Sequence, residues 1–250
     1  MKRADSAVPL SAATVTTLVN APVIAPVIAI DGPAAAGKGT LARRLARSLG
    51  LPYLDTGLLY RAVGRRVLDG GGDPTDPATA EAAARSLAPS DLDRTDLRGP
   101  EADTAASAVA AVPTVRSALL AFQRDFAAQR GAVLDGRDIG TTIFPDAPVK
   151  LFITANPHER ARRRWLQLRE RGEDIELARV EADMRARDER DTARSAAPLR
   201  AADDAVILDT TELNADDAYA AALRAVHDRL PELVKSDQTN LPDQTNHPVR

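Results

Sequence analysis

The chain has 250 residues, of which 44% are hydrophobic, so it is long enough to bury one α/β core of ordinary size. Its formal net charge of −3 provides no general basic field for nucleic acid or an anionic membrane, and neither partner is expected. The absence of cysteine excludes disulfides, thiolate catalysis and cysteine metal sites, and it is compatible with a cytoplasmic location.

Residues 1–25 begin with Met1-Lys2-Arg3 and continue as a run rich in Ser, Thr and Ala. A secretory signal needs an uninterrupted apolar stretch, which the hydroxyl residues of this run break up. The segment is therefore predicted to be a disordered extension. No segment of the chain approaches the roughly 18 apolar residues of a membrane span.

A glycine-rich loop follows the first predicted strand, at residues 27–30. It matches G-x4-G-K, and the next segment, residues 41–49, has leucines spaced by four as in a helix. Strand, loop and helix in this order are the context that a phosphate-binding loop requires. Its backbone N–H groups would surround phosphate oxygens, and Lys38 would supply a mobile charge to the β- and γ-phosphates. The predicted ATP-binding residues are Gly32, Pro33, Ala34, Ala35, Ala36, Gly37, Lys38, Gly39 and Thr40.

The residue after Lys38 is glycine, and the hydroxyl group arrives one position later, at Thr40. GTPases and motor ATPases place Ser or Thr directly after this lysine. A G-K-G-T loop is similar to that of nucleoside monophosphate kinases.

Strands and helices alternate along the rest of the chain. Further strands are predicted at residues 53–55, 132–134, 149–153 and 205–208. Further helices are predicted at residues 58–68, 77–87, 104–111, 113–129, 157–171, 175–193 and 215–230, with residues 88–103 as a polar loop. The pattern predicts five parallel strands covered by helices on both faces. Residues 233–250, which contain a repeated Asp-Gln-Thr-Asn, are predicted to be a disordered tail.

The chemically informative segments all follow a predicted strand. They are residues 31–40, 55–61 and 135–138. Ligands of open parallel sheets bind at the carboxyl ends of the strands, so these segments predict one cleft. Arginines at 187, 190 and 194 share a helical face, and residues 160–164 form a basic turn. Such arginines could hold an acceptor phosphate, or they could pair with neighbouring acidic residues on a solvated helix.

Five segments together make the chain resemble bacterial cytidylate kinases over about residues 26–230. They read GPAAAGKGT (32–40), LDTGLLYR (54–61), SAVAAVPTVR (107–116), DGRDIGTTIFPDAPVK (135–150) and RDERDTARSAAPL (187–199). The resemblance implies a P-loop kinase domain at residues 26–232, with a lid and arginine-rich helices at 157–194 and a monophosphate-binding insert at 70–106. That insert contains no convincing strand pair and is expected to be short. The implied reaction is ATP-dependent phosphorylation of CMP and dCMP.

The resemblance also implies roles for individual residues. Ser107 and Asp138 would face the cytosine amino edge, and Arg116 the ring acceptors. The CMP-binding set would be Thr56, Arg61, Ser107, Arg116, Arg137, Asp138, Arg187, Asp191 and Arg194. The catalytic set would be Lys38, Arg137, Arg187 and Arg163, with Arg163 in the lid that closes over ATP. Thr40 and Asp135 would hold Mg²⁺, the latter through water.

Two other functions remain open from the residues alone. One is a P-loop kinase of another small acceptor, such as UMP or a shikimate-like molecule. The other is a nucleotide-binding regulator without turnover, against which Lys38, Arg116 and Asp138 argue. The enzyme is expected to be a monomer that binds ATP and CMP or dCMP.

Overall fold

The computed structural model describes residues 26–234. The disorder predicted for residues 1–25, and for residues 235–250 of the tail, lies outside this range. The strands are β1 (Val27–Asp31), β2 (Tyr53–Asp55), β3 (Ala132–Asp135), β4 (Val149–Thr154) and β5 (Val206–Asp209). They form one sheet in the order β2-β3-β1-β4-β5, and every neighbouring pair is parallel. The predicted five-stranded parallel sheet is confirmed.

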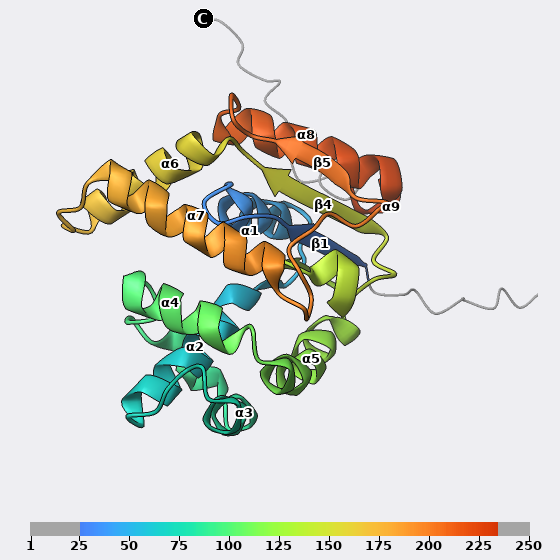
Figure 1. Ribbon diagram of the computed structural model, residues 1–250. Coiled ribbons are helices and arrows are strands. Elements are labelled where there is room, and N and C mark those ends of the chain that lie inside the picture. The colour runs from blue at the N-terminus through green and yellow to red at the C-terminus, as the bar shows by residue number, and fades with distance from the viewer. Residues whose placement is uncertain (1–25, 235–250) are drawn as a thin grey trace, which may run out of the picture.

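Helices cover both faces of the sheet (Figure 1). Alternate residues of β1 divide between two apolar cores, with Val27 and Ala29 in one and Ile28 and Ile30 in the other, as the period of two in a strand requires. Helices α1 (Lys38–Ser48) and α8 (Ala215–Arg229) complete the second core. The first core is completed by α2 (Thr56–Asp69), α3 (Pro77–Arg85), α4 (Pro100–Val109) and α5 (Pro113–Ala128).

Helices α6 (Pro157–Glu170) and α7 (Leu177–Ala193) pack against each other and carry the predicted lid. Their shared apolar cluster includes Leu168, Val180 and Met184, and the phosphate-loop residues Ala34 and Ala35 pack against it. Figure 1 shows the pair reaching past the sheet, with α7 beside α4. The pair therefore adjoins both the phosphate loop and the insert.

Several element bounds differ from the predicted ones. Helix α4 begins at Pro100 instead of Thr104, because proline at the first helical position already has a helical φ. The predicted loop 88–103 also contains a 3₁₀ helix, η1 (Pro89–Asp93), and Asp91 accepts a hydrogen bond from the Ala88 N–H at its start (2.8 Å). A π-helical turn, η2 (Ile139–Ile143), lies in the segment expected to link two strands. Residues 70–106 contain no strand, as predicted.

The tail is predicted to begin at residue 233, and the described residues end just beyond it, at Val234. A short helix, α9 (Pro231–Val234), continues past residue 233, and Leu233 packs against the second core. A helix of four residues is too short for a helical period to be visible in the sequence. Within residues 26–234, no helix taken singly has the length and apolar character to cross a bilayer. Taken together, the helices Pro100–Val109 and Pro113–Ala128 have the length and composition of a membrane span, but the two helices meet at a bend of 98°.

Candidate active site

The phosphate loop connects the end of β1 to the start of α1, and the backbone requires glycine at two of its positions. A Cβ at Gly32 would overlap the carbonyl of Ile153 in β4, and Gly37 caps α1 with a φ of 91° in the left-handed region. Lys38 is the first residue of α1, and its Nζ donates to the carbonyl of Pro33 at 2.8 Å. The loop therefore presents the start of a helix and a lysine at one place, as anion binding requires.

The Lys38 side chain is buried among charges. Burial, followed by the nearby Arg137, lowers the pKa of Lys38 to about 7, while the carboxylate of Asp135 acts in the opposite direction. A lysine in these surroundings gains most from an added anion, because a phosphate would compensate the charge that burial disfavours.

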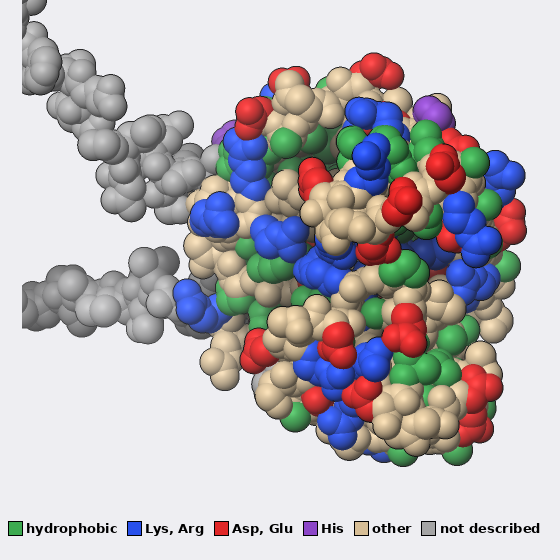
Figure 2. All heavy atoms as spheres, turned by 90° about the vertical axis from the view of Figure 1, so that its left-hand side faces the viewer, with side chains coloured by type: hydrophobic (Ala, Val, Ile, Leu, Met, Phe, Trp, Pro, Cys, Tyr) green, Lys and Arg blue, Asp and Glu red, His purple; other side chains and the backbone are tan. Residues whose placement is uncertain are grey.

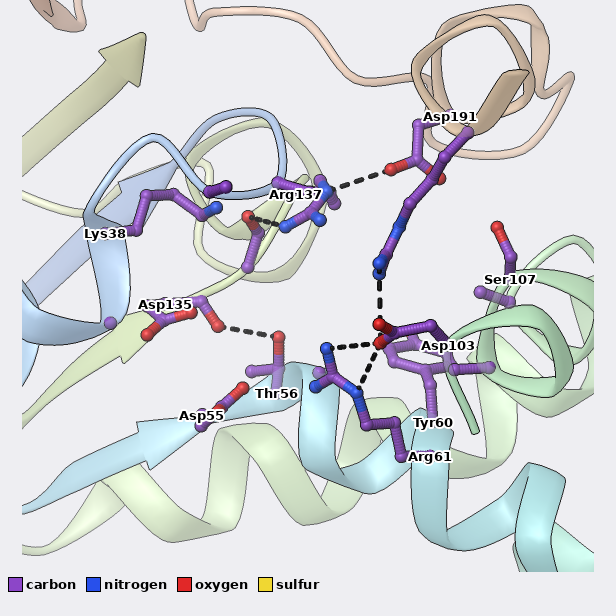
Figure 3. A pocket seen from close by; sticks show the side chains of 18 of the residues that line it. Lys38, Asp55, Thr56, Tyr60, Arg61, Asp103, Ser107, Asp135, Arg137 and Asp191 are labelled. Atoms are coloured by element: carbon purple, nitrogen blue, oxygen red, sulfur yellow. Dashed lines mark hydrogen bonds and ion pairs between the residues drawn. The ribbon is translucent and has the colours of Figure 1, made fainter. Parts of the chain in front are cut away.

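The end of β3 brings Asp135 opposite Lys38. The hydroxyl of Tyr53 donates to Asp135 Oδ2 at 2.7 Å, and the hydroxyl of Thr56 donates to the backbone carbonyl of Asp135 at 2.8 Å. Burial raises the pKa of Asp135, and the adjacent Asp55 raises it further, against the effect of Lys38. The two carboxylates and the Thr40 hydroxyl all line the same cleft (Figure 3).

These oxygen donors suit Mg²⁺ without forming a closed cage. Within residues 26–234, no group of three or more His, Cys, Asp or Glu side chains is arranged to hold a metal. Mg²⁺ keeps several waters and usually takes one or two carboxylates together with substrate phosphates. The residues present therefore fit an ion that arrives with a nucleotide.

Asp31, at the end of β1, fixes the loop that follows β3. Its two carboxylate oxygens accept the backbone N–H groups of Ile139 and Gly140, both at 2.8 Å. The side chain is buried, and burial raises its pKa to about 7 against those two hydrogen bonds. Because Arg137 and Asp138 precede these amides directly, Asp31 couples the phosphate loop to the residues predicted to contact CMP.

Arg116 and Asp138 form a buried ion pair at one end of the cleft. The Arg116 guanidinium also lies over the ring of Tyr60, 5.5 Å from its centroid. Burial opposes the charge of Arg116, but its neighbours Tyr60 and Asp138 hold its pKa above the usual value. A donor and an acceptor thus stand side by side, which is the pattern needed to read a base edge.

A second cluster of charged side chains surrounds Asp191 of α7. Arg137 Nε donates to Asp191 Oδ2 at 3.0 Å, and Arg194 Nε donates to the Asp191 carbonyl at 3.3 Å. A buried terminal nitrogen of Arg194 and the buried Nε of Arg187 have no hydrogen-bond partner among the described residues. Buried unpaired donors are costly, so these two groups are suited to receive an anionic ligand.

One cleft joins these groups. Nine Lys and Arg side chains and five aspartates line it, although the whole chain has a net charge of −3. Figure 2 views the side that carries α6 and α7, and Lys and Arg side chains gather across the middle of this face. The cleft is therefore a local basic site on an acidic protein.

Most of the predicted site residues lie on this cleft. The lining includes Ala34, Ala35, Gly37, Lys38, Gly39, Thr40 and Asp135. It also includes the full set predicted for CMP: Thr56, Arg61, Ser107, Arg116, Arg137, Asp138, Arg187, Asp191 and Arg194. Gly32, Pro33 and Ala36 are buried behind the loop and do not line the cleft.

The structure does not bring Arg163 to the cleft. Its guanidinium donates to the hydroxyl of Thr210 at 3.0 Å and to the carbonyl of Thr210 at 2.6 Å, after β5. The neighbouring Arg164 lines the cleft instead. A catalytic role for Arg163 would need these bonds to break, and it stays a prediction.

Sequence reasoning missed several residues that line the cleft or support it. Asp103, Arg98 and Gln167 line it, and Asp31, which belongs to the informative segment 31–40 but has no predicted role of its own, supports it. Asp31 had a detectable signal, a charged residue directly at the end of an otherwise apolar buried strand. Asp103 had none, because it lies in a segment predicted to be a loop and matches no motif.

The parallel sheet, the phosphate loop and the arginine-rich cleft define a P-loop kinase fold of the nucleoside monophosphate kinase type. Comparison with known proteins makes this more specific. A family model described as cytidylate kinase matches residues 28–228. The chain is 63% identical over 205 residues to a cytidylate kinase of Granulibacter bethesdensis, covering 82% of this chain and 98% of that protein. It is 62% identical over 201 residues to a cytidylate kinase of Acidiphilium cryptum, covering 80% and 95%. This chain belongs to the cytidylate kinase family.

Proposed function

We propose that the protein transfers the γ-phosphoryl group of ATP to CMP and dCMP, giving ADP with CDP or dCDP. The observation that carries this proposal is the single cleft, in which the phosphate loop faces a cradle of arginines and the Arg116–Asp138 pair. Phosphoryl transfer depends mainly on positioning and on neutralising charge, and this cleft is built from groups that do both.

The donor half is the phosphate loop. Its backbone N–H groups and Lys38 would bind the β- and γ-phosphates of ATP, and Lys38 would follow the charge that develops in transfer. Mg²⁺, held by Thr40 and, through water, by Asp135, would neutralise phosphate charge when bound. Arg137 lies close enough to Lys38 to lower its pKa, and both line the cleft, so both cations would contact the transferred group.

The acceptor half is the arginine cradle. Arg61, Arg187 and Arg194 would bind the CMP phosphate, whose oxygen is already nucleophilic and needs no strong base. Asp138 would accept a hydrogen bond from the cytosine amino group, Arg116 would donate to the ring acceptors, and Asp191 would contact the sugar. Thr56 and Ser107 also line the cleft and would complete the acceptor site.

We also propose that the protein acts in the cytoplasm and binds neither nucleic acid nor membrane. The proposed enzyme is a monomer that binds ATP and CMP or dCMP. The cleft has a local excess of basic side chains on a protein with a net charge of −3, which favours small nucleotides over nucleic acid or membrane. A cytoplasmic location agrees with ATP and CMP as substrates.

The test is a coupled assay of ADP release with CMP, dCMP, UMP, AMP and shikimate as acceptors. We expect the highest kcat/KM with CMP and dCMP and a much lower value with UMP. A preference for UMP or shikimate would reassign the acceptor. Nucleotide binding without ADP release in the presence of CMP would instead indicate a regulator.

A further inference from the structure

The carboxylate of Asp103 lies among three guanidinium groups from three other helices. Arg61 of α2 contacts Asp103 Oδ1 through Nε at 3.0 Å and through a terminal nitrogen at 2.9 Å. Arg164 of α6 donates to Oδ2 at 2.7 Å, and Arg187 of α7 lies 3.4 Å from Oδ1. Figure 3 shows the Asp103 carboxylate facing the Arg61 guanidinium, and both residues line the cleft.

Two of these three arginines belong to the set expected to bind the acceptor phosphate. Arg forks bind carboxylate and phosphate through the same planar pattern of donors, so the two anions compete for one cradle. The carboxylate satisfies this cradle incompletely, because the buried Nε of Arg187 has no partner among the described residues. A phosphate with three terminal oxygens offers more acceptors than the two oxygens of Asp103.

The charges explain why an internal anion is present. Burial, and next the nearby Arg137, lower the pKa of Arg187 to about 10, against the effect of Asp103. Burial opposes the ionisation of Asp103, yet Arg187, Arg61 and Arg164 together hold its pKa below the usual range. Without Asp103, three guanidinium groups would face one another in a partly buried space, and Arg187 would keep Asp191 as its nearby acidic group.

We propose that Asp103 is a built-in substitute for the acceptor phosphate. It gathers Arg61, Arg164 and Arg187 while the cleft is empty, and it gives up Arg61 and Arg187 when the phosphate of the acceptor arrives. The exchange also loosens a direct tie between α4 and the α6–α7 pair, because Arg164 and Arg187 belong to that pair. Asp103 is thus a positioning residue that lowers the affinity for the acceptor and for free phosphate. This inference rests on the proposed function, since it takes Arg61 and Arg187 to be ligands of the CMP phosphate.

The test measures binding constants instead of activity alone. Asp103→Asn should bind CMP and inorganic phosphate about tenfold more tightly than the wild type, because the competing charged hydrogen bonds are weakened. Titration calorimetry gives both dissociation constants. In steady-state kinetics the KM for CMP should fall, and kcat should change much less than KM. Asp103→Glu, which keeps the charge, should stay within about threefold of the wild type.

Glu101→Gln is the matched control. It removes one negative charge from the same turn of α4, but Glu101 is exposed and pairs with Arg65, outside the cradle. Its affinities for CMP and phosphate should equal those of the wild type. If Asp103→Asn does not fold, Asp103→Ala is the second neutral variant, since alanine has the best helix propensity.

The outcomes separate the two proposals. If the wild type turns over CMP but folded neutral variants bind CMP and phosphate no more tightly, Asp103 only holds the arginines in place and this inference is wrong. If the wild type neither binds nor phosphorylates CMP, the proposed function fails and this inference fails with it. Tighter binding of CMP and phosphate by Asp103→Asn, with unchanged binding by Glu101→Gln, would support the proposal that Asp103 takes the place of the acceptor phosphate.

Discussion

Replacing Asp138 by asparagine should lower kcat/KM for CMP and raise kcat/KM for UMP, so the preference for cytosine over uracil should shrink. Asp138 is buried and paired with Arg116, which lies over Tyr60. In the proposed complex the carboxylate accepts a hydrogen bond from the cytosine amino group. Uracil presents a carbonyl at that position, and a carboxylate repels it. Asparagine keeps the shape and an acceptor for Arg116, and its amide can donate to a carbonyl.

The magnitude follows from the two effects of the change. A hydrogen bond to a charged group contributes about 1.5–3 kcal/mol, so kcat/KM for CMP should fall by about 10- to 150-fold. Removing the repulsion of the uracil carbonyl should help UMP by a comparable amount. Together they correspond to about 3–6 kcal/mol, or a 10²- to 10⁴-fold change in the ratio of kcat/KM values. Sites built around a polar partner reach discrimination of this size.

The assay compares kcat/KM for CMP and UMP in the wild type and in Asp138→Asn. Asparagine is preferable to alanine, because truncation leaves the buried Arg116 without its ionic partner and can cost about 3–5 kcal/mol of stability. A melting temperature close to that of the wild type would show that the variant is folded. If kcat/KM falls equally for CMP and UMP, Asp138 only holds Arg116 in place and does not read the base.

Three further predictions concern the donor half. Lys38→Ala should lower kcat by about 10²–10³ with a small change in melting temperature, because Lys38 meets charge that develops in transfer; turnover within about fivefold of the wild type would remove the loop from catalysis. Burial raises the pKa of Asp31 in the folded state to about 7, from its usual value of 3.8. The protonated side chain therefore stabilises the folded state fully below about pH 4, and this stabilisation is lost as the pH rises through 7. Relative to Asp31→Asn, the unfolding free energy of the wild type should fall by about 1.4 kcal/mol per pH unit between these values, as measured by urea unfolding; parallel pH profiles would contradict it. Chelation of Mg²⁺ should abolish ADP release reversibly while leaving CMP affinity nearly unchanged in calorimetry; a matching loss of CMP affinity would place the metal at the acceptor instead.

The parts of the fold that the sequence predicts are those with strong local patterns. The β-branched runs and their spacing from the helices predict the five strands of the sheet, and the G-x4-G-K loop predicts where the phosphate donor would bind. Short elements with little periodicity are less accessible. Helix α9 and the π-helical turn η2 are examples, because each spans a single turn and depends on tertiary packing.

The candidate site divides in the same way. Residues inside motifs, such as Lys38 and Asp138, can be predicted from the sequence because the chemistry fixes their spacing, and both line the cleft. Asp103 and Arg164 act through contacts between helices that are far apart in the chain, and no local pattern specifies such contacts. Arg163 shows the related difficulty, since adjacent arginines on one helix point in different directions and only one of the two lines the cleft.

The three aspartates that neutralise arginines in this cleft are not equivalent, and the difference bears on which one a substrate can displace. The side chains of Asp138 and Asp191 are 5% and 7% exposed, whereas that of Asp103 is 16% exposed. Asp103 contacts more arginines than Asp138 does, yet it leaves Arg187 Nε without a partner. A carboxylate that moves aside must recover hydration, and this is easiest for the most exposed of the three. The incoming anion must also gain bonds that the carboxylate did not make, which the unpaired nitrogen of Arg187 offers. Both considerations select Asp103 as the carboxylate that yields, while in the proposed complex Asp138 and Asp191 would stay in place to contact the nucleoside.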